Sequence, residues 1–155
     1  MIPLMDDIDR KICSILQEAG RTSSAELAEA VGLSLSAAND RVRRLAAQGA
    51  IAGWQARLDP QSFGLGLCAF MLLDLSFDGE AEAVAELVRH PEVQELHHIS
   101  GPHSYLMKLR VADTRALQAF LTRVVKPLPA VLRTESIITL DTAKETAAIA
   151  VGADR

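Results

Sequence analysis

Several features that would mark an enzyme or a membrane protein are missing from this chain of 155 residues. It has no glycine-rich phosphate loop, no serine beside a plausible general base and no carboxylate pair in an apolar setting, so we predict no catalytic residue and no cofactor. No apolar run is long enough to span a bilayer, and the first residues lack the basic region and apolar core of a secretion signal. We therefore expect a cytoplasmic protein that makes no contact with a membrane.

Cysteine and positive charge are also scarce. Cys13 and Cys68 lie far apart within apolar runs, which is typical of buried free thiols rather than of a disulfide or a metal site. Sixteen lysines and arginines stand against twenty acidic residues, a formal net charge of −4. This balance excludes a protein that coats nucleic acid by charge alone, because such binding depends on neutralising phosphates. Any contact with DNA must be local.

One segment, residues 23–44, has the pattern of a helix-turn-helix. Ser23 can cap a helix while Glu26, three residues on, reaches back to it, and Gly32 ends that helix. Ser34 caps the next helix, which ends near Gly49. A preceding helix, from about residue 7 to residue 19 with Asp6 as its cap, packs its apolar face against these two. The inward face of this preceding helix consists of Ile8, Ile12, Ile15 and Leu16.

The helix after Ser34 carries a local basic patch, since residues 34–57 hold four arginines and one acid. A recognition helix reads base edges with its N-terminal residues, so Ser36, Ala37 and Asn39 are the candidate readers, and Asn39 is suited to adenine. Arg43 and Arg44 lie further along and are suited to phosphates. The alternative is a three-helix scaffold with a solvated arginine face. The complete set predicted to contact DNA is Ser23, Ser34, Ser36, Ala37, Asn39, Asp40, Arg41, Arg43 and Arg44.

The second half of the chain alternates in the order strand, helix, strand, strand, helix, strand, which predicts a ferredoxin-like βαββαβ sandwich and an α+β protein. The strands are expected at residues 67–77, 93–100, 105–111 and 131–141, and the helices at 80–90 and 114–125. Turn formers after residue 53 mark a boundary. We therefore predict a DNA-binding domain at 1–53, a linker strand and hinge at 54–66, a second domain at 67–142 and a tail at 143–155. Trp54 is expected to pack in the hinge rather than to stack on a base.

The first strand of the second domain is apolar on both of its faces. Leu67, Ala69, Met71, Leu73 and Leu75 lie on one face, and Cys68, Phe70 and Leu72 lie on the other. Two helices cover only one face of such a sheet, so the other face also needs cover. We therefore predict a homodimer, which would also give the recognition helices a two-fold arrangement.

In several segments the chain resembles the Lrp/AsnC, or feast/famine, family of transcription regulators. The matching segments are DDIDRKICSILQEAGR, ELAEAVGLS, RVRRLAAQGAIAGWQARLDP, HPEVQELHHISGPHSYLMKLRV and VLRTESIITLDTAKE, in that order. The resemblance implies a winged-helix-type DNA-binding domain followed by a ferredoxin-like (ACT-like, RAM) domain that forms dimers and often octamers. It also implies an amino-acid effector bound near subunit interfaces by the turn between the second and third strands, which is residues 100–106 here.

That turn departs from the family pattern, in which acidic residues follow the glycine. This chain keeps Gly101 and Tyr105 but has Pro102 and Ser104 where the acids would be. A serine hydroxyl offers an ammonium group only a neutral hydrogen bond, about half as strong as one from a carboxylate. The same residues could instead form only a tight interface turn. The candidate effector-binding residues are Gly101, Pro102, His103, Ser104, Tyr105, Thr134 and Ser136.

Three histidines, His97, His98 and His103, raise a metal-sensing hypothesis. Because neighbours on a strand point to opposite faces, His97 and His98 cannot easily share one ion, and only Glu95 lies on the face of His97. We therefore predict no metal ligand, and His103 could instead contact an effector carboxylate or act as a pH-sensitive contact. Two functions remain as alternatives to an effector-controlled DNA regulator: a metal-responsive repressor and a stand-alone small-molecule-binding module.

Overall fold

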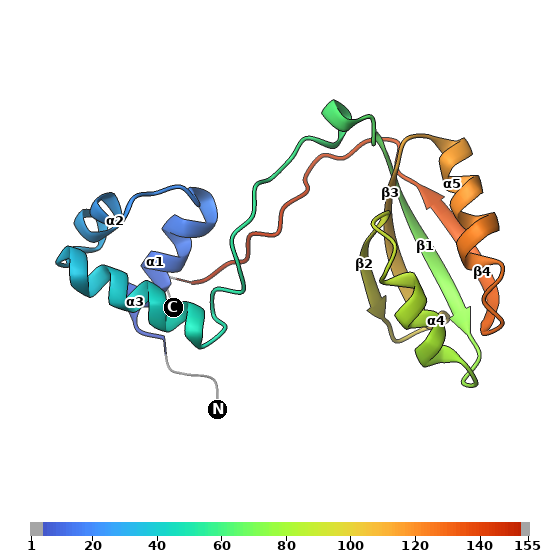
Figure 1. Cartoon of the computed structure of the whole chain (residues 1–155), viewed down its shortest axis with the longest axis horizontal. Helices are drawn as coiled ribbons and strands as arrows, with labels where there is room; N and C mark the ends of the chain where they lie inside the picture. The colour runs from blue at the N-terminus through green and yellow to red at the C-terminus, as the bar shows by residue number, and fades with distance from the viewer. Residues whose placement is uncertain (1–4, 153–155) are drawn as a thin grey trace. The chain divides into compact units, whose positions relative to one another are not determined.

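The computed structural model describes residues 5–152, which form two compact units. Unit 1 contains residues 5–57 together with 144–152, and unit 2 contains residues 58–143. Figure 1 shows the helices of unit 1 and the sheet of unit 2 with its helices. Within the described residues, no helix is both long enough and apolar enough to cross a membrane.

Unit 1 is built from α1 (Asp7–Glu18), α2 (Ser24–Val31) and α3 (Leu35–Ala47). The predicted caps are confirmed: Asp6, Ser23 and Ser34 each accept a hydrogen bond from a backbone N–H in the first turn of the helix that follows. Gly32 ends α2 with φ of 69°, a left-handed conformation that glycine adopts without strain. The core of unit 1 is the contact of Ile12, Leu27 and Leu45, one from each helix.

The prediction of a linker strand after α3 is wrong. Residues 52–59 contain no strand, and the chain continues into the short 3₁₀ helix η1 (Pro60–Phe63), which is capped by Asp59. A strand needs a backbone partner, whereas the contact with the neighbouring segment described here is a side-chain one: Arg57 Nη2 donates to the Glu145 carbonyl at 2.8 Å. The Trp54 side chain is 55% exposed and forms part of the wall of a groove in unit 1, so it is not packed in a hinge core.

The segment after residue 143 does not stand apart as a tail but packs on α1 and belongs to unit 1. The Gln17 side-chain amide donates to the Ile149 carbonyl at 2.8 Å and accepts from the Ile149 N–H at 3.1 Å. Arg10 Nη1 donates to the Val151 carbonyl at 3.0 Å. The chain therefore returns from the last strand of unit 2 to the helices of unit 1 (Figure 1).

Unit 2 has the predicted ferredoxin-like order. Its elements are β1 (Leu67–Leu75), α4 (Glu80–Leu87), β2 (Val93–His98), β3 (Tyr105–Val111), α5 (Thr114–Phe120), which continues as the π-helical turn η2 (Leu121–Val125), and β4 (Val131–Ile138). The sheet order is β2-β3-β1-β4, and all neighbours are antiparallel. The expected α+β class and the expected order of strands and helices along the chain are thus confirmed.

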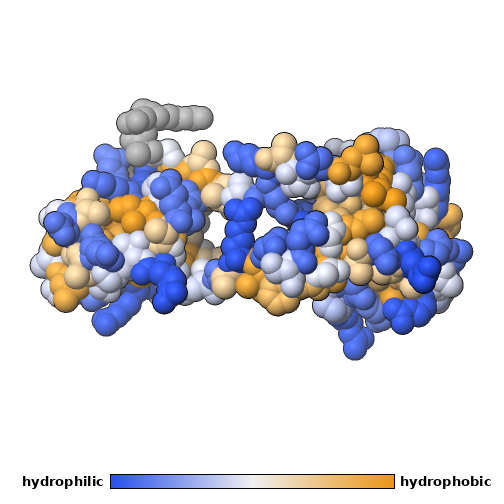
Figure 2. All heavy atoms as spheres, turned by 90° about the horizontal axis from the view of Figure 1, so that it is seen from above, coloured by the Kyte–Doolittle hydropathy of each residue, from blue (hydrophilic) through white to orange (hydrophobic). Residues whose placement is uncertain are grey.

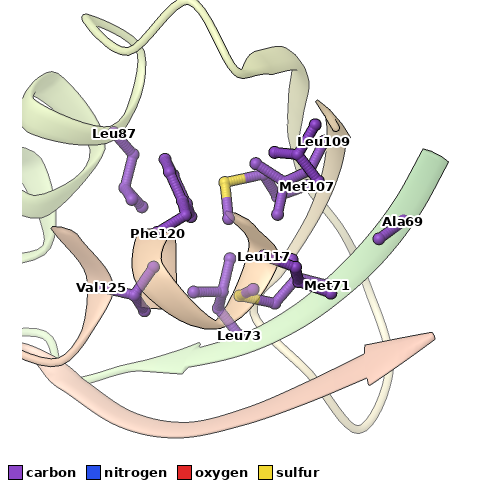
Figure 3. Close-up of a cluster of buried hydrophobic side chains, with 10 residues drawn as sticks. Ala69, Met71, Leu73, Leu87, Met107, Leu109, Leu117, Phe120 and Val125 are labelled. Carbon is purple, nitrogen blue, oxygen red and sulfur yellow. The ribbon is translucent and has the colours of Figure 1, made fainter. Parts of the chain in front are cut away.

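The core of unit 2 lies between the sheet and the helices α4 and α5 (Figure 3). Met71 and Leu73 of β1 and Met107 and Leu109 of β3 point from the sheet toward Phe120 of α5, and all five are fully buried. Alternation along a strand places the intervening residues on the opposite face.

We call this opposite side of the sheet the open face. The register pairs Leu72 of β1 with Leu106 of β3 and Phe70 of β1 with Ile137 of β4 across it. In the single chain Phe70, Leu72 and Leu106 are only half-buried, and Ile137 is exposed. Figure 2 also shows apolar side chains at the surface of both units. The open face therefore retains the uncovered apolar surface that the pattern of β1 predicts.

Candidate functional sites

The N-terminal half of α3 presents small polar side chains at the surface. Ser34 Oγ accepts from the Ala37 N–H at 3.2 Å and lies 3.2 Å from Ser36 Oγ. Ser36 is exposed and Asn39 is half-exposed, whereas Ala38 and Leu45 are buried against the other helices. Of the predicted reading residues, Ser36 and Asn39 thus lie on the outward side of α3, where base edges could reach them, whereas Ala37 is half-buried.

Arg43 extends freely from this same helix. Its side chain is 80% exposed, and its nearest acidic partner is Asp40, with 3.6 Å between Nη1 and Oδ1 on an equally open surface. An ion pair of this kind contributes little to stability. Of the three arginines predicted to contact DNA, Arg43 has the side chain most available to a phosphate.

Arg41 and Arg44 occupy a different environment, because both are hydrogen-bonded to carboxylates at the N-terminal end of α1. Arg44 Nη2 donates to both oxygens of Asp9 at 2.8 and 2.7 Å. Arg41 Nη1 donates to Asp9 Oδ1 at 2.9 Å and to Asp6 Oδ2 at 2.6 Å. The hydrogen bond from Arg41 lowers the pKa of Asp6, and the two carboxylates raise the pKa of Arg41. We call these four residues the Asp6/Asp9/Arg41/Arg44 network.

Sequence reasoning missed both acids of this network. It assigned Asp6 only as a helix cap and gave Asp9 no role, because the arginines lie 32 to 35 residues away from them. The available signal was a pair of acids three residues apart at the start of one helix and a pair of arginines three residues apart on another. Such spacing places each pair on one side of its helix.

Ser23, also predicted to contact DNA, is engaged in its own capping box at the start of α2. Its backbone N–H and its hydroxyl both donate to Glu26 Oε2, at 2.8 and 2.7 Å. These bonds lower the pKa of Glu26. The Ser23 hydroxyl is exposed but already has two partners, since it also accepts from the Glu26 N–H at 3.3 Å.

The turn between β2 and β3 is held by bonds of Ser104. The Ser104 N–H donates to the Leu73 carbonyl at 3.0 Å, its carbonyl accepts from the Ile99 N–H at 2.9 Å, and its hydroxyl accepts from the Leu75 N–H at 3.4 Å. Gly101 has φ of 132°, which favours glycine at that point of the turn. Pro102 is exposed at the tip.

The remaining effector candidates fall on two different sides of the sheet. Tyr105 lies on the core side, where its hydroxyl donates to Glu80 Oε1 of α4 at 2.9 Å, and Thr134 and Ser136 are exposed at core-side positions of the edge strand β4. His103 lies on the open-face side, with Nδ1 3.1 Å from Asp74 Oδ1 and Nε2 4.0 Å from Glu135 Oε2. A single chain therefore does not gather all the candidates into one pocket.

The other two histidines point to opposite sides of β2, as expected. His97 Nε2 lies 3.2 Å from Glu95 Oε2, and Lys108 Nζ donates to Glu95 Oε1 at 3.1 Å; both contacts lower the pKa of Glu95. His98 stacks on Tyr105 with ring centroids 4.9 Å apart. Among residues 5–152, no group of three or more histidines, cysteines and acids is arranged to hold a metal ion.

Comparison with known proteins matches each unit to a described domain family. Residues 5–52 match the family "Winged helix-turn-helix DNA-binding", and residues 68–149 match "Lrp/AsnC ligand binding domain". The transcriptional regulator LrpA of Mycobacterium tuberculosis is 39% identical over 89% of this chain and 91% of its own length.

Two similar solved structures are complexes with L-methionine. A transcriptional regulator of Neisseria meningitidis in complex with L-Met has a TM-score of 0.91 at 29% identity, covering 96% of this chain and 97% of that one. The feast or famine regulatory protein of M. tuberculosis, complexed with L-methionine, has a TM-score of 0.87 at 37% identity, covering 94% and 99%.

Proposed function

This chain belongs to the Lrp/AsnC family of DNA-binding transcription regulators, and from this premise we propose which residues read DNA and what controls them. We propose that two subunits present two copies of α3 to a two-fold DNA site, and that a small molecule bound by unit 2 changes the affinity for that site. The family assignment makes the protein a regulator and not an enzyme. It does not favour the metal-responsive or stand-alone-module alternatives. We propose that the protein acts in the cytoplasm, where DNA-binding regulators of this bacterial and archaeal family work.

At the DNA surface we assign base reading to Ser36, Ala37 and Asn39, and phosphate contact first of all to Arg43. The observation that carries this assignment is the division of α3 into a buried side, with Ala38 and Leu45, and an outward side, with Ser36, Asn39 and Arg43. Ala37 lies at the edge of this surface, four and seven residues before Arg41 and Arg44. The amide of Asn39 can bond bidentately to adenine, and the Arg43 guanidinium can bond to a phosphate. Ser23, Ser34 and Asp40 border this surface.

The second copy, we propose, covers the open face of unit 2. Phe70, Leu72 and Leu106 would be fully buried only by a partner, and an isologous contact through the same residues of both chains gives the two-fold axis that paired half-sites require. Further association of such dimers, up to an octamer, is supported by the family resemblance. The exposed apolar side chains Leu132, Ile138 and Leu140, on and after the edge strand β4, offer a surface for it.

We propose that the effector is an amino acid bound at the turn between β2 and β3 where two subunits meet. The match of unit 2 to a ligand-binding family and the two L-methionine complexes among similar structures support this proposal. The backbone at Gly101 and His103, shaped by Pro102, and the side chain of Ser104 would come from one subunit. Tyr105, Thr134 and Ser136 lie on the core side of the sheet and would come from a neighbouring subunit, because one chain does not bring them to the open side of the turn.

A binding experiment with the full chain tests the proposed function. DNA from upstream of the protein's own gene is titrated in a gel shift, with and without each amino acid. We expect a shifted complex whose apparent Kd changes with at least one amino acid, to the extent that this ligand binds the two assemblies with different affinity. No shift under any condition would contradict the DNA-reading proposal, and a shift that ignores every amino acid would contradict the effector proposal alone.

A further inference from the structure

Asp9 is the one buried residue with an ionisable acid or base side chain, other than cysteine, in the described part of the chain, and its neighbours are two arginines. Its side chain is 5% exposed and bonds to two guanidinium groups of α3, those of Arg41 and Arg44. A buried carboxylate is strongly disfavoured unless such partners compensate for its lost hydration. These bonds are therefore an obligatory part of how α1 and α3 fit together.

The network also joins α1 and α3 at two successive positions along each helix. Arg41 and Arg44 are three residues apart on α3, and Asp6 and Asp9 are three residues apart at the start of α1, so each pair lies along one side of its helix. Arg41 contacts both acids, and Arg44 contacts Asp9 through both carboxylate oxygens. Two linked contacts, added to the packing of Ala38 and Leu45, hold the rotation of α3 about its own axis more tightly than a single contact would.

That rotation decides which residues α3 presents to DNA. Ser36, Asn39 and Arg43 recur at spacings of three and four, and therefore share a side of the helix distinct from the one held by Arg41 and Arg44. Hydrogen bonds to bases need donors and acceptors placed within a fraction of an ångström. A helix that can rotate about its axis therefore loses sequence-specific base contacts before it loses its electrostatic attraction to phosphates.

We infer that Asp6 and Asp9 are positioning residues for base reading: although they carry the charge that DNA repels, they hold α3 in its reading orientation by holding Arg41 and Arg44. The inference rests on the proposed role of α3. It also means that the charges of these two arginines are largely neutralised within unit 1. Arg41 and Arg44 therefore contribute mainly to the fold and less to DNA binding.

The variant Asp9→Asn separates this role from simple electrostatics and from unfolding. The probes are a duplex enriched by the wild-type full chain from a random-sequence pool and a shuffled duplex of the same composition. Removing the carboxylate releases Arg44, so affinity for the shuffled duplex should stay the same or rise. Affinity for the enriched duplex should fall, which lowers the specificity ratio by about tenfold or more, the scale of one well-formed base contact.

Asp7→Asn is the matched control, because it removes the same charge from the first turn of α1, at an exposed position outside both the network and the residues predicted to contact DNA. It should raise both affinities slightly and keep the ratio. Asp6→Asn, at a half-exposed site, should lower the ratio in the same direction as Asp9→Asn but by less. Circular dichroism and the melting temperature establish that each variant is folded at the assay temperature.

Each pattern of results has one meaning. If folded Asp9→Asn and Asp6→Asn both keep the wild-type ratio, the positioning role is overturned, and if Asp9→Asn raises both affinities equally, the acids act only by charge. If Asp9→Asn does not fold, the specificity ratio of Asp6→Asn alone tests the positioning role: a lowered ratio supports it, and the wild-type ratio overturns it. If the wild-type chain enriches no sequence from the pool, the proposed reading function itself has failed, and this outcome is distinct from the others.

Discussion

At the scale of single side chains, the adjacent residues Arg43 and Arg44 of α3 lie in different environments. Arg43 is exposed beside one loosely placed acid, whereas Arg44 donates two short bonds to a buried carboxylate. Both were assigned to phosphate contact from the sequence, where they are indistinguishable. The difference follows from the turn of 100° per residue in a helix, which points one side chain outward and the next toward α1.

Arg43→Ala is therefore expected to weaken DNA binding without weakening the fold. One fewer phosphate contact should lower affinity for all sequences and reduce the slope of log K against log salt by about 0.9. The melting temperature should stay within about 1 °C, because an exposed pair contributes little. Arg44→Ala is the matched comparison and should lower the melting temperature by several degrees, since it leaves Asp9 short of a buried partner. Titrations at several salt concentrations and thermal melts check both, and equal melting temperatures for the two variants would contradict this account.

Asp6 gives a pH dependence of known sign. Arg41 and the Asp9 N–H lower the pKa of Asp6 below its ordinary value of 3.8 in the folded state. The ionised carboxylate therefore stabilises the fold fully above the unfolded pKa, and this contribution is lost as the pH falls through the folded pKa. Below about pH 4, wild-type stability should decrease more steeply than that of Asp6→Asn. If the melting temperatures of the two proteins fall in parallel between pH 5 and pH 2.5, the prediction is contradicted.

The elements themselves were largely predictable, because helix caps and strand alternation are local. Asp6, Ser23 and Ser34 cap the three helices as their sequence positions indicate, and the alternating burial of β1 and β3 follows their apolar pattern. The linker strand was predicted from composition around Trp54 but is absent, since composition does not supply a backbone partner. The links between Asp9 and Arg44 and between Gln17 and Ile149 join residues 35 and 132 positions apart. No local pattern encodes such pairs.

The docking of residues 144–152 on α1 predicts that Gln17 stabilises unit 1. Its amide makes two hydrogen bonds with the Ile149 backbone, and Gln17→Ala should lower the stability of unit 1 by about 1 kcal/mol. It should also increase cleavage by protease within residues 144–152. Glu18→Ala, next to it at the exposed end of the same helix, is the control that should leave cleavage unchanged. Equal cleavage of Gln17→Ala and the wild type would show that this docking is not held by the amide.

At the scale of the whole molecule, the open face of unit 2 is the feature that a single chain does not complete. Leu106 lies near its centre, opposite Leu72 of β1 and His97 of β2. Because its side chain is only half-buried in one chain, a charge there is tolerated by the monomer but not by a face-to-face dimer.

Leu106→Glu should therefore convert the protein to monomers at micromolar concentration, as measured by sedimentation. Val88→Glu, at an exposed position on the helical side of unit 2, should sediment like the wild type. A wild-type chain that sediments as a monomer at this concentration would contradict the homodimer. If Leu106→Glu sediments like the wild-type dimer, the dimer interface does not lie on the open face.

Selection of duplexes from a random-sequence pool with the full chain shows whether paired α3 helices read DNA through Asn39 and its neighbours. We expect an enriched motif of two inverted half-sites, separated by about one helical turn of DNA or a multiple of it. Asn39→Ala should relax the preference at one position in each half-site while still binding. An enrichment without symmetry, or a motif that Asn39→Ala leaves intact, would contradict this expectation.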